Sequence, residues 1–446
     1  MRFHNQIFLA LIFGAVVGAL TDANTRVLGL PLLAIHDTLG NLFVNSLKMV
    51  VVPLVTSALV AAMIGIGQGR DLGRLGGKTL VWYLGTTTLA VLTALLLFNL
   101  LQPGIIDGLP AGERLGLAAD TDAVVASISN SGAGDFSGIV MQIFPANIVA
   151  AAAEGQLLGL IVFSMLFGMF LRRQQGAAAQ SLKLTISGFY DTMVAITLFL
   201  IRFAPLGVYA LIARTVAQTG YDAIAPLAWF FGAVLLALAI HAFVVLPLLL
   251  LLLARRHPGR HLKAMAPALL TAFSSASSAA TLPLTMECVE RRSGVSRRTS
   301  SFVLPLGATV NMDGTALYEC AAVLFIAQAY GVDLNLASQA LIVVVAVLTS
   351  IGVAGIPSAS LVAITLILTT VGLPAEAIGL ILVTDRLLDM ARTAVNIWGD
   401  SVGAVVIGRS EEEDNILSLP VAQMEVHHRS DSTAVETPSQ ASTQTP

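Results

Sequence analysis

Residues 381–407 read ILVTDRLLDMARTAVNIWGDSVGAVVI, an apolar segment of helix length that carries a row of polar side chains. The polar positions follow the first at offsets of four, seven, eleven and fifteen residues, and they are Asp385, Asp389, Arg392, Asn396 and Asp400. At about 100° per residue these side chains fall within roughly 80° of one another, so a helix presents them as one face, here called the polar stripe. An ionisable group at membrane depth costs about 2.5–3.5 kcal/mol, so the stripe predicts a functional site if this helix spans a membrane.

The composition favours a membrane protein over a soluble protein with one amphipathic helix. Hydrophobic residues make up 56% of the chain and charged residues only 11%, against roughly 25% charged residues in soluble domains. The net charge of −3 gives no indication of a nucleic-acid partner. Cys288 and Cys320 lie in or beside apolar segments without metal-ligand spacing, so they predict neither a disulfide framework nor a zinc site.

Eight apolar stretches have about the 20 residues that a membrane crossing needs. They lie at roughly 6–22, 41–66, 79–102, 156–171, 185–216, 224–254, 299–328 and 377–408. The first has a charged lead and an apolar core, as a signal peptide does, but no small-residue cleavage site follows, so we interpret it as a spanning helix. Basic loops near Arg74, Arg173, Arg255 and Arg291 mark the cytoplasmic side, and both termini are expected there.

Two further segments are predicted to enter the membrane and return to the same side. The basic clusters around Arg255 and Arg291 are separated by about 27 mostly apolar residues, fewer than the roughly 40 that two crossings need. The centre, FSSASSAATLP at 273–283, suits a re-entrant helical hairpin with a non-helical tip. A second such segment, about 336–370, is interrupted by GVAGIPSAS at 352–360. Hairpin followed by helix, twice and from opposite faces, indicates an inverted repeat and a binding site between its halves.

The stretch PLGATVNMDGTALYE at 305–319 places poor helix formers inside a spanning segment. We expect the helix to unwind at Asn311, Asp313 and Gly314, which frees backbone oxygens for an alkali cation together with side-chain oxygens of the polar stripe. A simple glycine kink, with Asp313 paired to an arginine, is the structural alternative.

The stripe also contains groups that suit a zwitterionic ligand. Asp389 suits an ammonium group, and the planar fork of Arg392 suits a carboxylate, so an acidic amino acid would engage both. The alternative is that Asp389 and Arg392 pair with each other at i, i+3. Serine hydroxyls and helix N-termini at the hairpin tips could bind an α-carboxylate, although small residues there also permit close helix packing.

At these motifs the sequence resembles the dicarboxylate/amino acid:cation symporter family, which contains the excitatory glutamate transporters and the archaeal aspartate transporters. The resemblance rests on SSAATLP at 277–283, NMDGTALYE at 311–319, GVAGIPSAS and DRLLDMARTAVNIWGD at 385–400, and it extends to LKMVVVPLV at 47–55 and YLGTT at 83–87. It implies an all-α polytopic membrane protein with eight transmembrane helices, two re-entrant hairpins and inverted repeats. It also implies a homotrimer that transports by an elevator movement.

The resemblance divides the chain into a static scaffold and a moving transport domain. The expected parts are scaffold helices at 1–75, a transport-domain helix at 76–102, an extracellular loop with scaffold helices at 103–218, a transport domain with both hairpins at 219–410 and a disordered cytoplasmic tail at 411–446.

The resemblance further implies roles for individual residues. Substrate contacts would come from Ser277, Ser278, Thr315, Ile356, Pro357, Ser358, Asp389, Arg392, Thr393 and Asn396. Asp389 would bind the ammonium group and Arg392 the side-chain carboxylate, while Asn396 and Ser278 would bind the α-carboxylate. One sodium ion would use Gly307, Asn311, Asn396 and Asp400; a second would use Tyr83, Thr86, Thr87, Asn311 and Asp313; a third would use backbone oxygens of Thr309, Ser350, Ile351 and Val353.

This chain departs from the family pattern at three positions. Archaeal members have an arginine where this chain has Ala276, and the chain instead has Arg386, which would compensate the missing charge or pair with Asp385. Glu319 stands where proton-coupled members have glutamate, so it is a candidate proton carrier. Val353 replaces a common threonine, which a backbone ligand tolerates.

We therefore predict a symporter of the inner membrane that imports L-glutamate or L-aspartate with Na⁺, H⁺ or both, and that needs no organic cofactor. The expected partners are the small-molecule substrate, membrane lipid and two further copies of the chain. A C4-dicarboxylate or neutral amino acid symporter of the same family is the nearest rival. A channel is a second rival, and an intramembrane hydrolase built on Ser277 or Ser278 lacks a nearby base to activate the hydroxyl.

Overall fold

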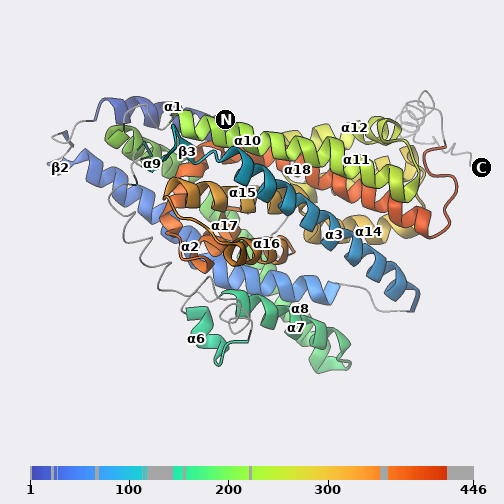
Figure 1. Cartoon of the computed structure of the whole chain (residues 1–446). Coiled ribbons are helices and arrows are strands. Elements are labelled where there is room, and N and C mark those ends of the chain that lie inside the picture. The colour runs from blue at the N-terminus through green and yellow to red at the C-terminus, as the bar shows by residue number, and fades with distance from the viewer. Residues whose placement is uncertain are drawn as a thin grey trace, which may run out of the picture.

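The structure is a computed structural model of the chain, and it is built almost entirely of helices (Figure 1). It describes residues 3–21, 25–27, 29–65, 70–112, 114–115, 117, 144–153, 157–219, 224–351 and 360–418. Two short antiparallel ladders are present, β1 (Arg26–Val27) with β2 (Leu30–Pro31) and β3 (Ile105–Ile106) with β4 (Leu109–Pro110). The predicted all-α class is therefore confirmed.

The helices of the first half are α1 (Phe3–Ala19), α2 (Leu32–Gly65), α3 (Arg70–Leu101), α6 (Ile148–Ala153), α7 (Leu157–Arg173), α8 (Ala177–Ile201) and α9 (Ala204–Thr219). Helix α10 (Ile224–Ile240) continues through the π-helical turn η1 (His241–Val245), α11 (Leu246–Leu249) and the π-helical turn η2 (Leu250–Ala254) as one long rod. The second half contains α12 (Pro258–Ser275), α13 (Ser278–Glu287), η3 (Cys288–Arg292), α14 (Arg297–Val310), α15 (Asp313–Ala329), α16 (Leu336–Ser350), α17 (Ser360–Thr370), η4 (Ala375–Ala377) and α18 (Ile378–Ser410).

Four segments of the described chain are helical, long and apolar enough to cross a membrane, and they are Arg74–Leu101, Ala177–Leu200, Ala225–Ala254 and Arg297–Ala329. Shorter apolar helices lie at Val52–Ile64, Ala204–Arg214, Leu336–Ser350 and Ser360–Thr370. The predicted total of eight crossings stays a prediction, because length and composition alone do not place these helices in a bilayer.

One predicted span is wrong. The stretch 185–216 was expected as a single helix, but α8 ends at Ile201 and α9 begins at Ala204. Pro205 is the second residue of α9, where its missing N–H leaves no broken bond, whereas inside a continuous helix it would remove a hydrogen bond and clash with the preceding turn. The backbone N–H groups of Leu206 and Gly207 donate to the carbonyl of Phe203, which starts the new helix.

The first re-entrant segment forms a helical hairpin, as predicted. Helices α12 and α13 pack against each other and are joined by a tight turn at Ala276, whose φ of 51° lies in the left-handed region. Ser277 then caps α13, since its hydroxyl accepts a hydrogen bond from the backbone N–H of Ala280 at 3.2 Å. The arms of the second hairpin, α16 and α17, also contact each other, while its tip at 352–359 lies outside the described residues.

Contacts between the helices define two groups, and the division into scaffold and transport domain stays a prediction. Helix α2 packs on α7, α8 and α9, and α1 packs on α9. Helix α18 packs on α10, α12, α14 and α15, and α3 packs on α15 and α16. The long helices of both groups are visible in Figure 1, with α18 running behind α10 and α11. This grouping places the polar stripe inside the second group.

The predicted start of a disordered tail at Glu411 is wrong. Glu411 forms ion pairs with Arg74 and Lys78 of α3, both at 2.6 Å, and the hydrogen bond from Lys78 holds the pKa of the Glu411 carboxyl below its ordinary value. The backbone N–H of Leu417, which is buried, donates to the carbonyl of Ser293. The segment 411–418 is therefore held by contacts with residues distant in the sequence, which composition alone does not reveal, and residues 419–446 lie outside the described chain.

The contact between α1 and α9 leads to a first prediction. A Cβ added to Gly18 would lie 2.6 Å from the backbone oxygen of Ala213, whereas a Cβ on Gly232 of α10 would meet nothing within 4 Å. Gly18→Ala should therefore lower the free energy of unfolding by about 1–3 kcal/mol through overpacking. Gly232→Ala should raise it by up to about 1 kcal/mol through helix propensity. Thermal unfolding of the two variants in detergent checks both signs, and equal shifts would contradict the close contact.

Candidate functional site

The polar stripe on α18 is buried in protein. The exposed fractions are 3% for Asp385, 7% for Asp389, 0% for Arg392, 3% for Asn396 and 1% for Asp400. Burial at this level requires paired charges and satisfied hydrogen bonds, because unpaired ions away from water are costly. The stripe therefore faces neighbouring helices, as expected.

Arg392 is bound on one side of its guanidinium group only. Its Nη2 donates to Asp389 Oδ1 at 2.8 Å and to Asp385 Oδ1 at 3.0 Å, and its Cζ lies 3.9 Å from the ring centroid of Tyr318 on α15. Its Nε and Nη1 have no hydrogen-bond partner within the described part of the chain. The mutual pairing that was the structural alternative is thus present, and yet Nε and Nη1 each remain able to donate to a carboxylate.

Arg386 belongs to the same cluster. Its Nη1 lies 3.6 Å from Asp389 Oδ2, and only 9% of the residue is exposed. Residues three positions apart on a helix are neighbours, which explains why Arg386 reaches Asp389 although it lies about 100° from the stripe face of Asp385. The cluster then holds two carboxylates and two guanidinium groups, so its formal charges cancel.

Asn396 ties α18 to the start of α15. Its Oδ1 accepts a hydrogen bond from the backbone N–H of Gly314 at 2.8 Å, and its Nδ2 donates to Thr315 Oγ1 at 3.1 Å. Helix α14 ends at Val310 and α15 begins at Asp313, so the predicted unwinding is confirmed at Asn311, whereas Asp313 and Gly314 form the first turn of α15. The amide of Asn396 satisfies one of the N–H groups that a helix start leaves without a partner.

Side-chain oxygens from three helices converge at the break between α14 and α15. Thr87 Oγ1 lies 2.8 Å from Asp313 Oδ1, and Thr86 Oγ1 lies 3.2 Å from both Asp313 Oδ1 and Asn311 Oδ1. Asn311 Nδ2 donates to Asp400 Oδ1 at 2.9 Å. These hydroxyl, amide and carboxylate oxygens are the hard ligands that alkali cations prefer. Among the described residues no group of three or more His, Cys, Asp and Glu side chains is placed to hold a metal ion.

Because Gly307 has no side chain, the oxygens of Asp400 and Tyr83 can lie close to its backbone. A Cβ at Gly307 would lie 2.6 Å from Asp400 Oδ1 and 2.6 Å from the Tyr83 hydroxyl. The Tyr83 hydroxyl donates to the backbone oxygen of Val303 at 2.7 Å. The structure therefore brings together the two predicted sets of sodium ligands on α3, α14, α15 and α18.

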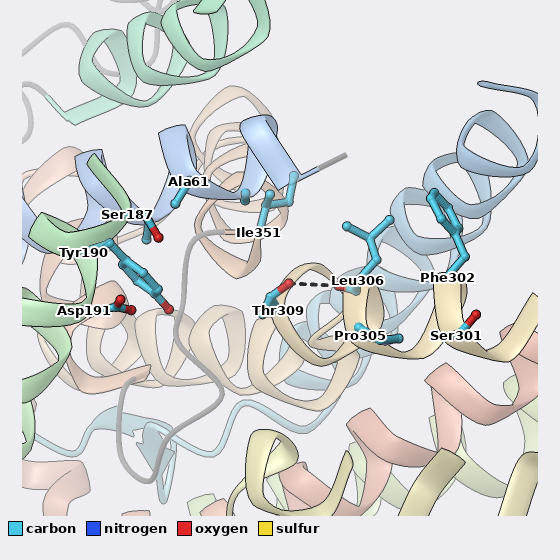
Figure 2. Close-up of a pocket in the computed structure, with 12 residues that line it drawn as sticks. Ala61, Ser187, Tyr190, Asp191, Ser301, Phe302, Pro305, Leu306, Thr309 and Ile351 are labelled. Carbon is cyan, nitrogen blue, oxygen red and sulfur yellow. Dashed lines mark hydrogen bonds between the residues drawn. The ribbon is translucent and has the colours of Figure 1, made fainter. Parts of the chain in front are cut away.

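Two residues of the third predicted set lie at a cavity. Thr309 and Ile351 line a cavity of about 380 Å³ between α2, α8 and α14. Figure 2 shows Tyr190 and Asp191 of α8 on one side of this cavity and Thr309 on another. No residue of the polar stripe lines it. Val353 lies outside the described residues, so the set cannot be completed there.

Of the remaining predicted substrate residues, some are described by the structure and others lie outside the described chain. Ser278 is buried at the start of α13, and Thr393 Oγ1 donates to the backbone oxygen of Asp389 at 2.8 Å. Ser277 is the cap of α13 described above. Ile356, Pro357 and Ser358 lie outside the described residues.

The sequence patterns did not single out His241. Its Nε2 lies 3.3 Å from Asp313 Oδ2, and both side chains are fully buried. The π-helical turn η1 places this imidazole at the cation cluster from α10. The available signal was a single histidine in the otherwise apolar span 224–254. Such residues at membrane depth indicate function by default.

Glu319 lies one helical turn beyond Thr315 on α15 and is fully buried. Its Oε2 accepts a hydrogen bond from Thr349 Oγ1 on α16 at 2.8 Å, and its Oε1 has no partner within the described chain. Thr349 was not predicted, because nothing in the sequence indicates that these two positions meet. The bond connects the candidate proton carrier to the first arm of the second hairpin.

Known proteins match almost the whole chain. The sequence profile described as the sodium:dicarboxylate symporter family matches residues 3–410. A proton/glutamate-aspartate symporter of Escherichia coli (strain K12) is 33% identical over 96% of this chain and 97% of its own length. A proton/sodium-glutamate symport protein of Geobacillus stearothermophilus is 34% identical over 92% and 94% of the two chains. Excitatory amino acid transporter 3 of Mus musculus is 31% identical over 91% and 84%.

A second prediction concerns Gly307. In Gly307→Ala the added methyl group would occupy space now held by oxygens of Asp400 and Tyr83. Losing one charged oxygen ligand should weaken Na⁺ binding by about ten-fold or more. Titration of purified protein with NaCl, followed by tryptophan fluorescence, measures this affinity. Gly232→Ala is the matched control, and an unchanged Na⁺ affinity in Gly307→Ala would place the cation elsewhere.

Proposed function

Because the chain belongs to the sodium:dicarboxylate symporter family, we propose that it is a secondary active symporter that carries L-glutamate or L-aspartate across the membrane together with Na⁺, H⁺ or both. Relatives named as proton/glutamate-aspartate and proton/sodium-glutamate symporters support this substrate class. The observation that carries the proposal is the buried guanidinium of Arg392, which keeps two donors without a partner among the described residues.

Arg392 selects for an acidic side chain in this proposal. A substrate carboxylate that accepts from Nη1 or Nε would satisfy a buried donor that has no partner among the described residues, whereas a neutral side chain would leave it unpaired. Asp389 binds the ammonium group, and Asn396 with Ser278 binds the α-carboxylate. A C4-dicarboxylate has no ammonium group for Asp389, which disfavours that rival. Uptake of succinate beside glutamate and aspartate separates the two.

Cations complete the site in the proposal. Asp313 and Asp400 are both buried, and Asp400 has a neutral amide, Asn311, as its hydrogen-bond partner. Two buried carboxylates are costly without nearby positive charge. Sodium ions held by the oxygens at the break between α14 and α15 would supply that charge. Since Asn396 binds the same break, cation binding and substrate binding act on one structural element.

The movement and the assembly are also proposals. The group around α18 would move as the transport domain against a scaffold of α1, α2, α7, α8 and α9, and three copies would assemble through the scaffold. The cavity between α2, α8 and α14 lies between these two groups, which supports a boundary there. We place the protein in the inner membrane with both termini in the cytoplasm, in accordance with the basic loops.

A third prediction tests Arg392. Arg392→Ala should reduce glutamate uptake into proteoliposomes by about a hundred-fold, because a buried charge-assisted hydrogen bond to the substrate carboxylate is lost. Serine uptake, measured in the same vesicles, should persist, since a neutral side chain does not need the guanidinium group.

The control variant is Arg386→Ala, which removes a cation from the same cluster without removing the free donors of Arg392. Melting curves of both variants show whether either has lost its fold. Unchanged glutamate affinity in Arg392→Ala would remove the assigned role.

A fourth prediction tests Glu319. If this carboxyl carries the coupled proton, wild-type uptake should fall as external pH rises above the range in which the carboxyl is protonated. Glu319→Gln should retain substrate binding and lose the pH dependence of turnover, because the amide preserves the hydrogen bond to Thr349 without titrating. Uptake at fixed Na⁺ across pH 5 to about pH 9 measures this. A pH profile in Glu319→Gln that matches wild type would show that the proton is carried elsewhere.

A further inference from the structure

An apolar groove of about 310 Å³ lies on the outer side of the helix group around α18, away from the polar stripe. Its walls are α10 with η1 and α12, and its floor is the face of α18 that carries Ala391, Ala394, Val395 and Trp398. The walls contain large side chains with much exposed surface, among them Phe243 at 67% and Phe273 at 45%. Every side chain that lines the groove is hydrophobic. In a membrane protein such a groove accepts a hydrocarbon chain.

The length of the groove corresponds to one leaflet of a bilayer. Along α12 it extends from Leu262 to Phe273, which is about 16 Å at 1.5 Å per residue. The hydrocarbon core of a bilayer is about 30 Å thick, so one leaflet contributes about 15 Å. Leu262 lies one turn from the start of α12, so along this helix the groove begins near the first turn, whereas on the other wall its last lining residue is Phe243 of η1. A single acyl chain of one leaflet fits this depth.

Basic residues cluster in the sequence at the start of α12, where the groove begins along this helix. The two helices that wall it are joined by residues 255–257, between the end of η2 and the start of α12. Arg255, Arg260 and Lys263 are all exposed there. Among the described residues the side chains of these three form no hydrogen bond or ion pair, unlike Arg256, which donates to the backbone oxygen of Asp414.

We propose that this groove, together with the basic end formed by Arg255, Arg260 and Lys263, is a binding site for an anionic phospholipid. The acyl chain lies against α10, α12 and α18, and the phosphate lies at the basic end. Each cation near an anionic membrane surface contributes favourably to such binding, and a zwitterionic headgroup receives much less of this attraction. The floor of the site is the reverse side of the helix that carries Arg392 and Asn396, so the lipid supports the helix on which the polar stripe is built.

Native mass spectrometry of the purified full-length protein tests the proposal without depending on transport. The probes are phosphatidylglycerol and phosphatidylcholine with the same acyl chains. Wild-type protein should retain phosphatidylglycerol in preference to phosphatidylcholine. Arg255→Gln/Lys263→Gln should weaken retention of phosphatidylglycerol by about ten-fold or more. Arg297→Gln/Arg298→Gln, which removes two exposed cations at the start of α14, is the matched control and should bind like wild type.

A second pair of variants tests the acyl chain. Ala239→Trp fills the groove from α10, whereas Leu236→Trp changes an exposed position of the same helix outside the groove. Only Ala239→Trp should lose the bound lipid, and melting curves establish that both variants are folded. Equal retention of the two phospholipids, or retention of phosphatidylglycerol by Ala239→Trp, would overturn the proposal. A change of oligomer mass in Ala239→Trp would also overturn it, since the groove would then hold a second copy of the chain.

Discussion

A guanidinium group with no exposed surface, Arg392, determines how the centre of this protein can be built. Two carboxylates on its own helix and the ring of Tyr318 on α15 compensate the positive charge. Such a group is strongly destabilising if its partners are removed, so α15 and α18 must stay packed at this point. Nε and Nη1 of Arg392 still have no hydrogen-bond partner among the described residues. The stability of the helix pair and the affinity for a carboxylate therefore come from the same side chain.

The broken helix depends on this packing. Between Val310 and Asp313 the chain gives up helical hydrogen bonds at membrane depth, where no water can replace them. Asn396, one turn beyond Arg392, supplies an acceptor for the backbone N–H of Gly314, and Gly314 can approach only because it has no Cβ to meet the backbone of Arg392. The oxygens of Asn311 and Asp313 are then directed at α3 and α18 instead of into their own helix. The cation site therefore depends on the break between α14 and α15, and that break is stabilised by the contact with Asn396 on α18.

The sequence was sufficient for features that depend on one segment at a time. The stripe follows from helical spacing, the first hairpin from the short distance between basic loops, and the break at Asn311 from helix propensity. It was insufficient where two distant segments meet. His241 reaches Asp313 from η1, and Thr349 reaches Glu319 from α16, and no local pattern indicates which residue either one meets. The same limit explains the ordered segment 411–418, whose acidic composition suggested a free tail until its partners on α3 and beside α14 were known. Pro205 is different, because its effect is local and the split between α8 and α9 was open to prediction.

Electrostatics also explains why cation and substrate binding would be coupled in the proposed symporter. Around Arg392 the formal charges of the cluster cancel, so a substrate with one net negative charge adds an uncompensated charge to a buried region. Around Asp313 and Asp400 the formal charges do not cancel, because the partners of these two carboxylates are amides, hydroxyls and an imidazole. Cations bound near Asp313 and Asp400 would neutralise the excess negative charge there. They would thereby lower the free-energy cost of binding an anionic substrate near Arg392. Asn396 lies between them and contacts the broken helix directly, so neither cluster can rearrange without moving the backbone that the other requires.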